Sequence, residues 1–302
     1  MLYKIYRLFL KIIMICNNCP RKCNIDRSKA TGVCGVGDMP RVARASLHKW
    51  EEPIISGKAG SATVFFSGCN LKCCYCQNYK ISHENVGKYI TYDRLAEIFK
   101  ELESQGAMNI NLVSPSHYTH AIKKALDIYR PNIPIVYNSS GYDSLSELEE
   151  LKDYIDVFLV DFKYFDSDLS KRLSKAPDYP EVAKSVILKM REIVPNEVYS
   201  DDGMLKKGVI IRHLVLPNHT DDSIKILDWI KENIPNPLVS LMSQYTPMYK
   251  AVLHPDIDRR LKPLEYKIVE EHMVKIGLTN GFAQELSSSD ACYVPDFDGS
   301  GV

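Results

Sequence analysis

A strand followed by a helix recurs six times along this chain, and no other feature of the sequence restricts the fold as strongly. The apolar run at 62–68, ended by glycine, predicts a buried strand, and a helix is predicted over 91–106. Further strands are predicted at 109–114, 133–141, 156–163, 209–215 and 238–242, with helical segments between them. Such a succession predicts an α/β fold of parallel strands joined by right-handed crossovers, in an open sheet or a full or partial barrel.

Small and polar residues stand where these apolar strands end. They are Gly68–Cys69, Ser114–His117, Asn138–Gly141, Asp161–Lys163, His213–Pro217 and Gln244–Tyr245. In open α/β sheets and β/α barrels, the carboxyl ends of parallel strands line the binding site. We therefore expect the functional site at this end of the sheet, where a cysteine-rich loop follows the first strand.

The repeating units occupy residues 61–245 and define a core, between an N-terminal cysteine-rich arm at 1–60 and a C-terminal extension at 246–302. The first 18 residues are basic and apolar, but Lys4, Arg7 and Lys11 interrupt a run already too short to span a membrane. We expect the first turns to pack on the domain or to form an amphipathic surface helix, with Met14 as an alternative start.

The charge and the cysteine distribution exclude two classes of protein. Lys+Arg and Asp+Glu both number 38, so the chain lacks the positive charge of a non-specific nucleic-acid binder. Eight of the nine cysteines precede residue 77, which favours metal ligation in a reducing cytoplasm over a secreted disulfide scaffold. The remaining one, Cys292, is expected to pack.

The segment GCNLKCCYCQN at 68–78 carries the most specific chemical signal. Cys69, Cys73 and Cys76 have the spacing C-x3-C-x2-C. Three thiolates can hold three irons of a cubane cluster and leave the fourth iron open, whereas a zinc site or an electron-transfer cluster usually takes a fourth protein ligand. The adjacent Cys74 is expected to be a packing residue, not a ligand.

The arm carries a second set of thiols with the spacing C-x2-C-x3-C-x10-C: Cys16, Cys19, Cys23 and Cys34. Four thiols in this pattern suit a structural zinc ion or a second iron–sulfur cluster, and the alternative is a reduced arm without metal. A cluster would relay electrons or anchor the arm, whereas zinc would only hold it.

With these cysteines after the first strand of a six-unit chain, the sequence resembles the radical SAM superfamily. Segments 45–57, 65–82, 109–118, 159–166, 212–220 and 294–301 are similar to its pyruvate formate-lyase activating enzyme-like branch, in the group with a cysteine-rich arm. The resemblance covers most of the chain. It implies a partial (β/α)6 barrel that binds a [4Fe–4S] cluster and S-adenosylmethionine (SAM).

The resemblance also implies roles for individual residues. Cys69, Cys73 and Cys76 match the cluster ligands, Tyr75 an aromatic residue near the adenine, and Asn78 a polar residue that contacts the cofactor. Ser114, with Pro115 and Ser116, replaces a Gly-Gly-Glu stretch for the methionyl amine. Asn138 stands at the ribose position, and Asp161 and Lys163 match an Asp-x-Lys motif whose lysine pairs with the methionyl carboxylate.

The implied reaction is reductive cleavage of SAM to methionine and a 5′-deoxyadenosyl radical, which abstracts a hydrogen atom. The target would be a glycine of a glycyl-radical enzyme, with modification of a small molecule or a peptide as the alternative. A non-catalytic iron–sulfur electron carrier is a rival from another class. Expected partners are an electron donor such as ferredoxin or flavodoxin and a protein substrate.

Several other residues have two interpretations each. His48, Glu51 and Glu52 lie over the mouth of the barrel or on a solvated edge strand. His117 and His213, at strand ends, belong to the site or are hydrogen-bonded structural histidines. The helix faces Leu95/Ile98/Phe99/Leu102 and Leu145/Leu148/Leu151 are expected in the core, and Glu270, Glu271 and His272 on a solvated face of a helix at 263–276.

Overall fold

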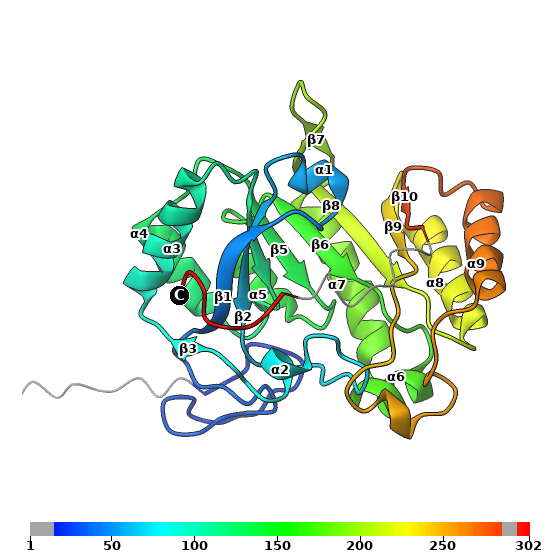
Figure 1. The fold of residues 1–302 in the computed structure, drawn as a ribbon, viewed down its shortest axis with the longest axis horizontal. Coiled ribbons are helices and arrows are strands. Elements are labelled where there is room, and N and C mark those ends of the chain that lie inside the picture. Colours follow the sequence, from blue (N-terminus) through cyan, green and yellow to red (C-terminus); the bar gives the residue numbers. More distant parts are fainter. Residues whose placement is uncertain (1–14, 286–294) are drawn as a thin grey trace, which may run out of the picture.

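The computed structural model describes residues 15–285 and 295–302, so the N-terminal segment with Met14, and Cys292, lie outside the described residues. Within them, a ten-stranded sheet has the order β10-β9-β8-β6-β5-β4-β2-β1-β3, with β7 paired to β8 (Figure 1). Its parallel centre is β2 (Ser61–Phe66), β4 (Ile110–Val113), β5 (Ile135–Ser139), β6 (Val157–Asp161), β8 (Leu205–Leu214) and β9 (Leu238–Met242). These are the six predicted strands, and they confirm the predicted α/β fold class.

The connecting helices cover the outer face of the curved sheet (Figure 1). They are α3 (Tyr92–Ser104), α4 (Thr119–Ile128), α5 (Leu145–Leu151), α6 (Ser167–Ser174), α7 (Tyr179–Ile193) and α8 (Thr220–Asn233). Thr91 caps α3 as predicted, because its hydroxyl accepts a hydrogen bond from the Arg94 amide at 3.1 Å. None of the helices in the described ranges is long and apolar enough to cross a membrane.

The predicted core faces are correct with one exception. Leu95, Ile98, Phe99 and Leu102 of α3 are all buried. In α5, Leu148 and Leu151 are fully buried, but Leu145 is 45% exposed. Leu145 is the first residue of its helix and projects beyond the edge of the core, so its prediction as a core residue was wrong.

Both ends of the chain add strands to this sheet. Strand β1 (Arg41–His48) of the arm pairs antiparallel with β2, and β3 (Lys88–Tyr89) pairs with β1. The extension contributes η1 (Ala251–Leu253), α9 (Pro263–Lys275) and β10 (Gly281–Ala283), which lies parallel to β9. The last residues run along β1 (Figure 1), where the Ala45 amide donates to the carbonyl of Ser300 at 2.9 Å.

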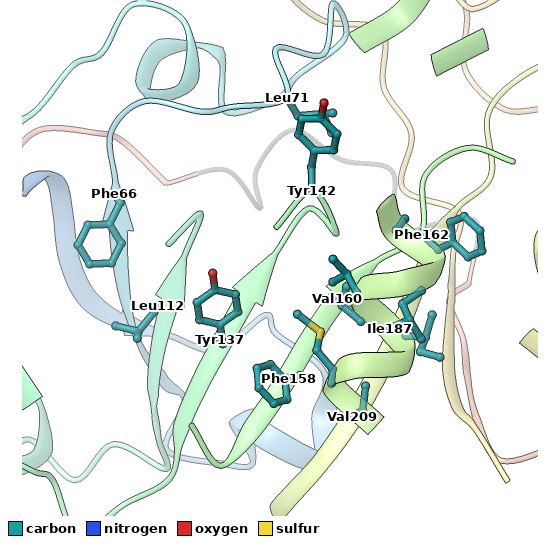
Figure 2. Close-up of a cluster of buried hydrophobic side chains, with 14 of the residues drawn as sticks. Phe66, Leu71, Leu112, Tyr137, Tyr142, Phe158, Val160, Phe162, Ile187 and Val209 are labelled. Atoms are coloured by element: carbon teal, nitrogen blue, oxygen red, sulfur yellow. The ribbon is translucent and has the colours of Figure 1, made fainter. Parts of the chain in front are cut away.

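Two hydrophobic layers enclose the strands. On the outer face, Val160, Phe162 and Ile187 lie together where the sheet meets α7 (Figure 2). On the inner face, Ile55 of α1 (Pro53–Ser56) packs against a smaller apolar cluster that includes Leu159. Helix α1 lies near β7 (Val198–Tyr199) and the start of β8, on the opposite side from α2 (Tyr79–Ser82), so it closes the amino-terminal end of the sheet (Figure 1). The predicted hairpin turn, Asp202–Gly203, joins β7 to β8.

Candidate radical SAM site

The cluster loop, residues 69–76, begins after β2 at a position that only glycine can occupy. Gly68 has a φ of +86°, and a Cβ atom there would lie 2.9 Å from the carbonyl oxygen of Cys34 and 3.1 Å from Nε2 of His117. The loop then leads into α2 at the carboxyl end of the sheet (Figure 1). This is the end at which the sequence predicted the site.

Hydrogen-bond donors point at the sulfur atoms of the three predicted cluster ligands. The hydroxyl oxygen of Ser174 lies 3.0 Å from Sγ of Cys73, and that of Ser82 lies 3.3 Å from Sγ of Cys76. Cys69 accepts a bond from a backbone amide at 3.4 Å. Donors of this kind set the potential of iron–sulfur clusters, because they stabilise negative charge on the sulfur.

The chemistry of this donor set fits a [4Fe–4S] cluster. Burial raises the pKa of Cys73, and burial together with Cys73 raises the pKa of Cys76 to about 12, so these thiols need a positive centre to become thiolates. The described residues hold no group of three or more His, Cys, Asp or Glu side chains gathered around a single metal ion. A cubane instead takes each thiolate at a separate iron. Cys69, Cys73 and Cys76 would hold it.

Cys74 faces the C-terminal extension. Its amide donates to the carbonyl of Leu173 at 2.8 Å, and its own carbonyl accepts from the Lys250 amide at 2.9 Å. Burial raises the pKa of its thiol to about 11, and Arg172 and Asp256 are among the charges around it. That Cys74 is not a ligand stays a prediction.

Tyr75 is connected to a cluster ligand by a line of hydroxyl groups. Its hydroxyl oxygen lies 2.7 Å from that of Tyr164, which lies 2.6 Å from Oγ of Ser174, the residue that contacts Cys73. The Tyr75 ring is buried and makes an edge contact with Tyr245 at 5.6 Å between ring centres. Sequence reasoning missed Tyr164 and Ser174. The contact of Tyr75 with adenine stays a prediction.

The residues predicted to hold the amine and the ribose of SAM lie on neighbouring strands. Ser114, which directly follows β4, has a φ of +59°, and its amide donates to the carbonyl of Asn138 at 3.0 Å. Asn78 precedes α2, and its carbonyl accepts a hydrogen bond from Ser82 at 2.9 Å. The structure therefore brings Ser114 and Asn138 together, and their contacts with SAM stay predictions.

Asp161, which is buried, is held by two partly buried cations. Lys163 Nζ lies 2.6 Å from one carboxylate oxygen, and Arg212 Nε donates to the other at 2.8 Å. Arg212 Nη2 also donates to the Asn138 side-chain oxygen at 2.8 Å. Burial alone would raise the pKa of Asp161, but Arg212 and Lys163 lower it overall. Arg212, which sequence reasoning missed, thus contacts Asp161 and Asn138 directly and is connected to Lys163 through Asp161. The available signal was an arginine within the apolar segment GVIIRHLVL at 208–216.

Glu51 and Glu52 reach the same network from the amino-terminal end of the sheet. Glu51 Oε2 lies 3.7 Å from Arg212 Nη1, and Glu52 accepts a hydrogen bond from the Ser240 hydroxyl at 2.8 Å. Burial raises the pKa of both carboxyl groups despite the nearby arginine. For Glu51 and Glu52 both predicted interpretations were therefore wrong. His48 is half-buried and pairs with Ser61 at the start of β2, away from the mouth of the barrel, and its place on β1 agrees with the edge-strand interpretation.

The histidines have structural surroundings. His117 Nε2 lies 2.9 Å from a backbone carbonyl, and His213 lies between another carbonyl at 2.7 Å and the Ser223 hydroxyl at 2.8 Å. Burial lowers the pKa of His117 to about 3 and that of His213 to about 4, so both rings are neutral. On α9, His272 Nε2 lies 2.6 Å from a carboxylate oxygen of Asp228.

The arm site, Cys16, Cys19, Cys23 and Cys34, is formed by two short turns. Residues Cys16, Cys19 and Cys34 are buried, and Cys23 is partly exposed. The Val33 amide lies 3.4 Å from Sγ of Cys23, and a Cβ atom on Gly32 would lie 2.8 Å from the same sulfur. Gly32 therefore leaves room for this thiol, and one backbone donor is directed at a sulfur of the arm site; a metal at this site stays a prediction.

Comparison with known proteins agrees with this geometry. The chain is 35% identical over 256 residues to the uncharacterized protein MJ0674 of Methanocaldococcus jannaschii, over 82% of this chain and 70% of that protein. It is 24% identical over 191 residues to the pyruvate formate-lyase-activating enzyme of Clostridium pasteurianum, over 55% of this chain and 79% of that one.

Solved structures show the same fold. Streptococcus suis SuiB bound to S-adenosylmethionine superposes with a TM-score of 0.50 at 16% identity, over 72% of this chain and 48% of that chain, so this chain spans about half of SuiB. A family model of the radical SAM superfamily matches residues 63–230, more than half of the chain. The chain therefore belongs to the radical SAM superfamily, which confirms the resemblance seen in the sequence and implies a [4Fe–4S] cluster and SAM as its cofactors.

Proposed function

We propose that this radical SAM enzyme cleaves SAM reductively and abstracts a hydrogen atom from a glycine of a partner protein, as a glycyl-radical activating enzyme would. The cluster at Cys69, Cys73 and Cys76 would supply the electron that breaks the sulfonium bond, which yields methionine and the 5′-deoxyadenosyl radical. The likeness to the pyruvate formate-lyase-activating enzyme of Clostridium pasteurianum supports a partner enzyme as the target.

The observation that carries SAM cleavage is the largely buried Asp161–Lys163 pair beside the cluster loop. The ammonium of Lys163 is 2.6 Å from Asp161 and acts electrostatically on the thiol of Cys73. A lysine ammonium has three donors and the bond to Asp161 uses one, so two remain for a carboxylate such as that of methionine. Lys163 can therefore orient SAM against the cluster.

The inner face of the sheet offers polar contacts to a substrate. Asp161 is buried there and Glu51 and Arg212 are partly buried, and the fully buried Asn111 of β4 lies close enough to the Glu51 carboxyl group to lower its pKa without closing a hydrogen bond. Unpaired buried amides are costly, so a bound group that pairs with Asn111 gains affinity. A peptide backbone, with alternating donors and acceptors, meets this requirement.

The first test is release of 5′-deoxyadenosine by the anaerobically reconstituted protein with dithionite and SAM. The matched control is Cys76→Ala, which removes one cluster ligand. Product that disappears in this variant supports the proposal. If the reconstituted wild-type protein contains its cluster but releases no 5′-deoxyadenosine, even after protein extract of the source organism is added, the proposal is contradicted. That result favours the alternative of a non-catalytic electron carrier.

The second test identifies the hydrogen donor. Protein extract from cells grown on α-deuterated glycine is added to the reaction, and mass spectrometry follows deuterium in 5′-deoxyadenosine. Extract from cells grown on unlabelled glycine is the control. Deuterium transfer supports a glycine target, whereas turnover that depends only on the small-molecule fraction favours the alternative of a small-molecule substrate.

We place the enzyme in the cytoplasm with a ferredoxin or a flavodoxin as its electron donor. A low-potential one-electron donor is required because the cluster must be reduced before SAM is cleaved. The eight cysteines in the described ranges form no disulfide with one another, which agrees with a reducing compartment.

A further inference from the structure

We propose that the arm site binds a second iron–sulfur cluster and that it passes electrons to the cluster loop through the contact between Cys34 and Cys69. This inference goes beyond the proposed function, because it concerns how the enzyme is reduced and not what it acts on. Three features carry it: the construction of the arm site, its direct contact with the cluster loop, and the other attachments of the arm.

The backbone holds the four thiols of the arm site in one small unit. The Cys16 amide donates to the carbonyl of Ile25 at 2.8 Å, and the Asn24 amide donates to the carbonyl of Cys16 at 3.1 Å. Lys22 and Asn24 take positive φ angles of +41° and +52°, which turn the chain tightly around Cys23. This short loop places the sulfur of Cys23 where the Val33 amide donates to it, and hydrogen bonds to sulfur tune iron–sulfur clusters.

The arm site touches the cluster loop through a ligand of each. The Cys69 amide lies 3.3 Å from the carbonyl oxygen of Cys34. One hydrogen bond therefore joins the residue that holds one centre to the residue that holds the other. Lys72 reaches the same carbonyl at 3.4 Å and the carbonyl of Ser82 at 2.6 Å, which places a cation between the two sets of thiols. Electron transfer slows steeply with distance, so this contact provides a short path.

The arm is already anchored without a metal. Arg21 donates to four backbone carbonyls: Asn70 at 2.8 Å, Leu71 at 3.3 Å, Ser174 at 3.2 Å and Lys175 at 2.6 Å. Strand β1 adds a sheet pairing with β2. Zinc has no redox chemistry and would add only another attachment. The described residues hold no group of three or more ligating side chains gathered for a single ion such as zinc, whereas a cubane takes each thiolate at a separate iron, so we favour iron.

The proposed transfer is balanced by one electron. A reduced low-potential carrier protein, of the iron–sulfur or flavin class, loses one electron to the arm site. The arm site then loses one electron to the cluster loop and returns to its oxidised state. No bond is formed or broken and no proton moves in either transfer.

The metal is tested in the full chain with Cys69→Ala/Cys73→Ala/Cys76→Ala, which removes the cluster loop ligands. After anaerobic reconstitution we expect about four irons per chain and the electron paramagnetic resonance (EPR) signal of a reduced cluster from the arm site alone. Zinc in place of iron, or no metal in a chain with the circular dichroism of the wild type, overturns the proposal. The complementary variant Cys23→Ser should lose the iron of the arm site and keep the iron of the cluster loop.

The transfer is tested by the EPR spectrum of the fully reduced wild type and by reduction rates. We expect spin–spin interaction between the centres, absent from Cys23→Ser. We also expect reduced ferredoxin to reduce the cluster loop centre at least tenfold more slowly in Cys23→Ser. Absence of the interaction, or equal rates, overturns the relay. These measurements use neither SAM nor substrate, so their outcome does not depend on whether the proposed function is correct.

Discussion

Replacing Arg212 by methionine is expected to lower the free energy of unfolding by about 3–5 kcal/mol, because removing one partner of a buried ion pair leaves the other charges uncompensated. The Arg212 side chain is 14% exposed and donates to Asp161 and to Asn138, each at 2.8 Å. Methionine retains much of the volume, so the loss reports mainly charge and hydrogen bonding and not a cavity.

The size of this loss should depend on pH. Burial already raises the pKa of Glu51, and Arg212 lowers it in part, so removing Arg212 raises it further. A carboxyl group whose folded pKa exceeds its unfolded value stabilises the protein below the unfolded pKa, and this contribution is lost as pH rises through the folded pKa. The cost of Arg212→Met should therefore be larger at about pH 8 than at about pH 5.

Anaerobic urea unfolding followed by circular dichroism measures the effect, with Arg212→Lys, Glu51→Gln and the double variant Arg212→Met/Glu51→Gln as comparisons. Lysine keeps the charge but not the forked geometry, so an intermediate cost is expected. The double variant should cost less than the sum of the single changes, because the unpaired acid is also removed. A cost below about 1 kcal/mol at pH 8, or the same cost at both pH values, would refute the reasoning.

Three further predictions concern single residues. Gly68→Ala should destabilise the protein by about 1–3 kcal/mol and reduce its iron content, whereas Gly106→Ala, also at positive φ but with no atom within 4 Å of the added Cβ, should cost less and keep the iron. Ser174→Ala removes a donor to sulfur and should lower the cluster potential by roughly 20–60 mV, the equivalent of about 0.5–1.5 kcal/mol, in an EPR redox titration. Burial raises the pKa of Glu52, so the ionised carboxylate destabilises the wild type as pH rises above the ordinary glutamate pKa of 4.5. Glu52→Gln should therefore become more stable relative to the wild type as pH rises. Urea midpoints that differ by the same amount at every pH would contradict this.

The fold was predictable because local pattern and tertiary structure agree. The strand at 238–242 has the predicted ends, and Thr91 caps α3 where the sequence places the cap. The long strand β8 starts four residues before its predicted start, because pairing with β7 extends it back to Leu205. Leu145 was misassigned because helical spacing alone does not show where the core ends.

The site was predictable only where its residues lie close together in the sequence. The spacing of Cys69, Cys73 and Cys76 predicts a cluster loop. Nothing in the sequence near Glu51 indicates that Arg212, 161 positions later, is its partner. That contact forms because α1, which follows Glu51 and Glu52, packs at the amino-terminal end of the sheet. Ser174 likewise reaches Cys73 only because α6 ends beside the cluster loop.

The two edges of the sheet have a consequence for aggregation. Strand β3 has two residues and covers only the start of β1, residues 299–300 bond to the next part of β1, and β10 has three residues, whereas β2 and β9 are fully buried. Gly281 allows the close pairing of β10, since a Cβ there would lie 1.8 Å from the Val239 carbonyl oxygen. Such short edges offer other chains almost no backbone for strand addition. Removing the residues after β9 would expose the apolar edge of β9. We therefore expect the C-terminal extension to reduce self-association of the protein.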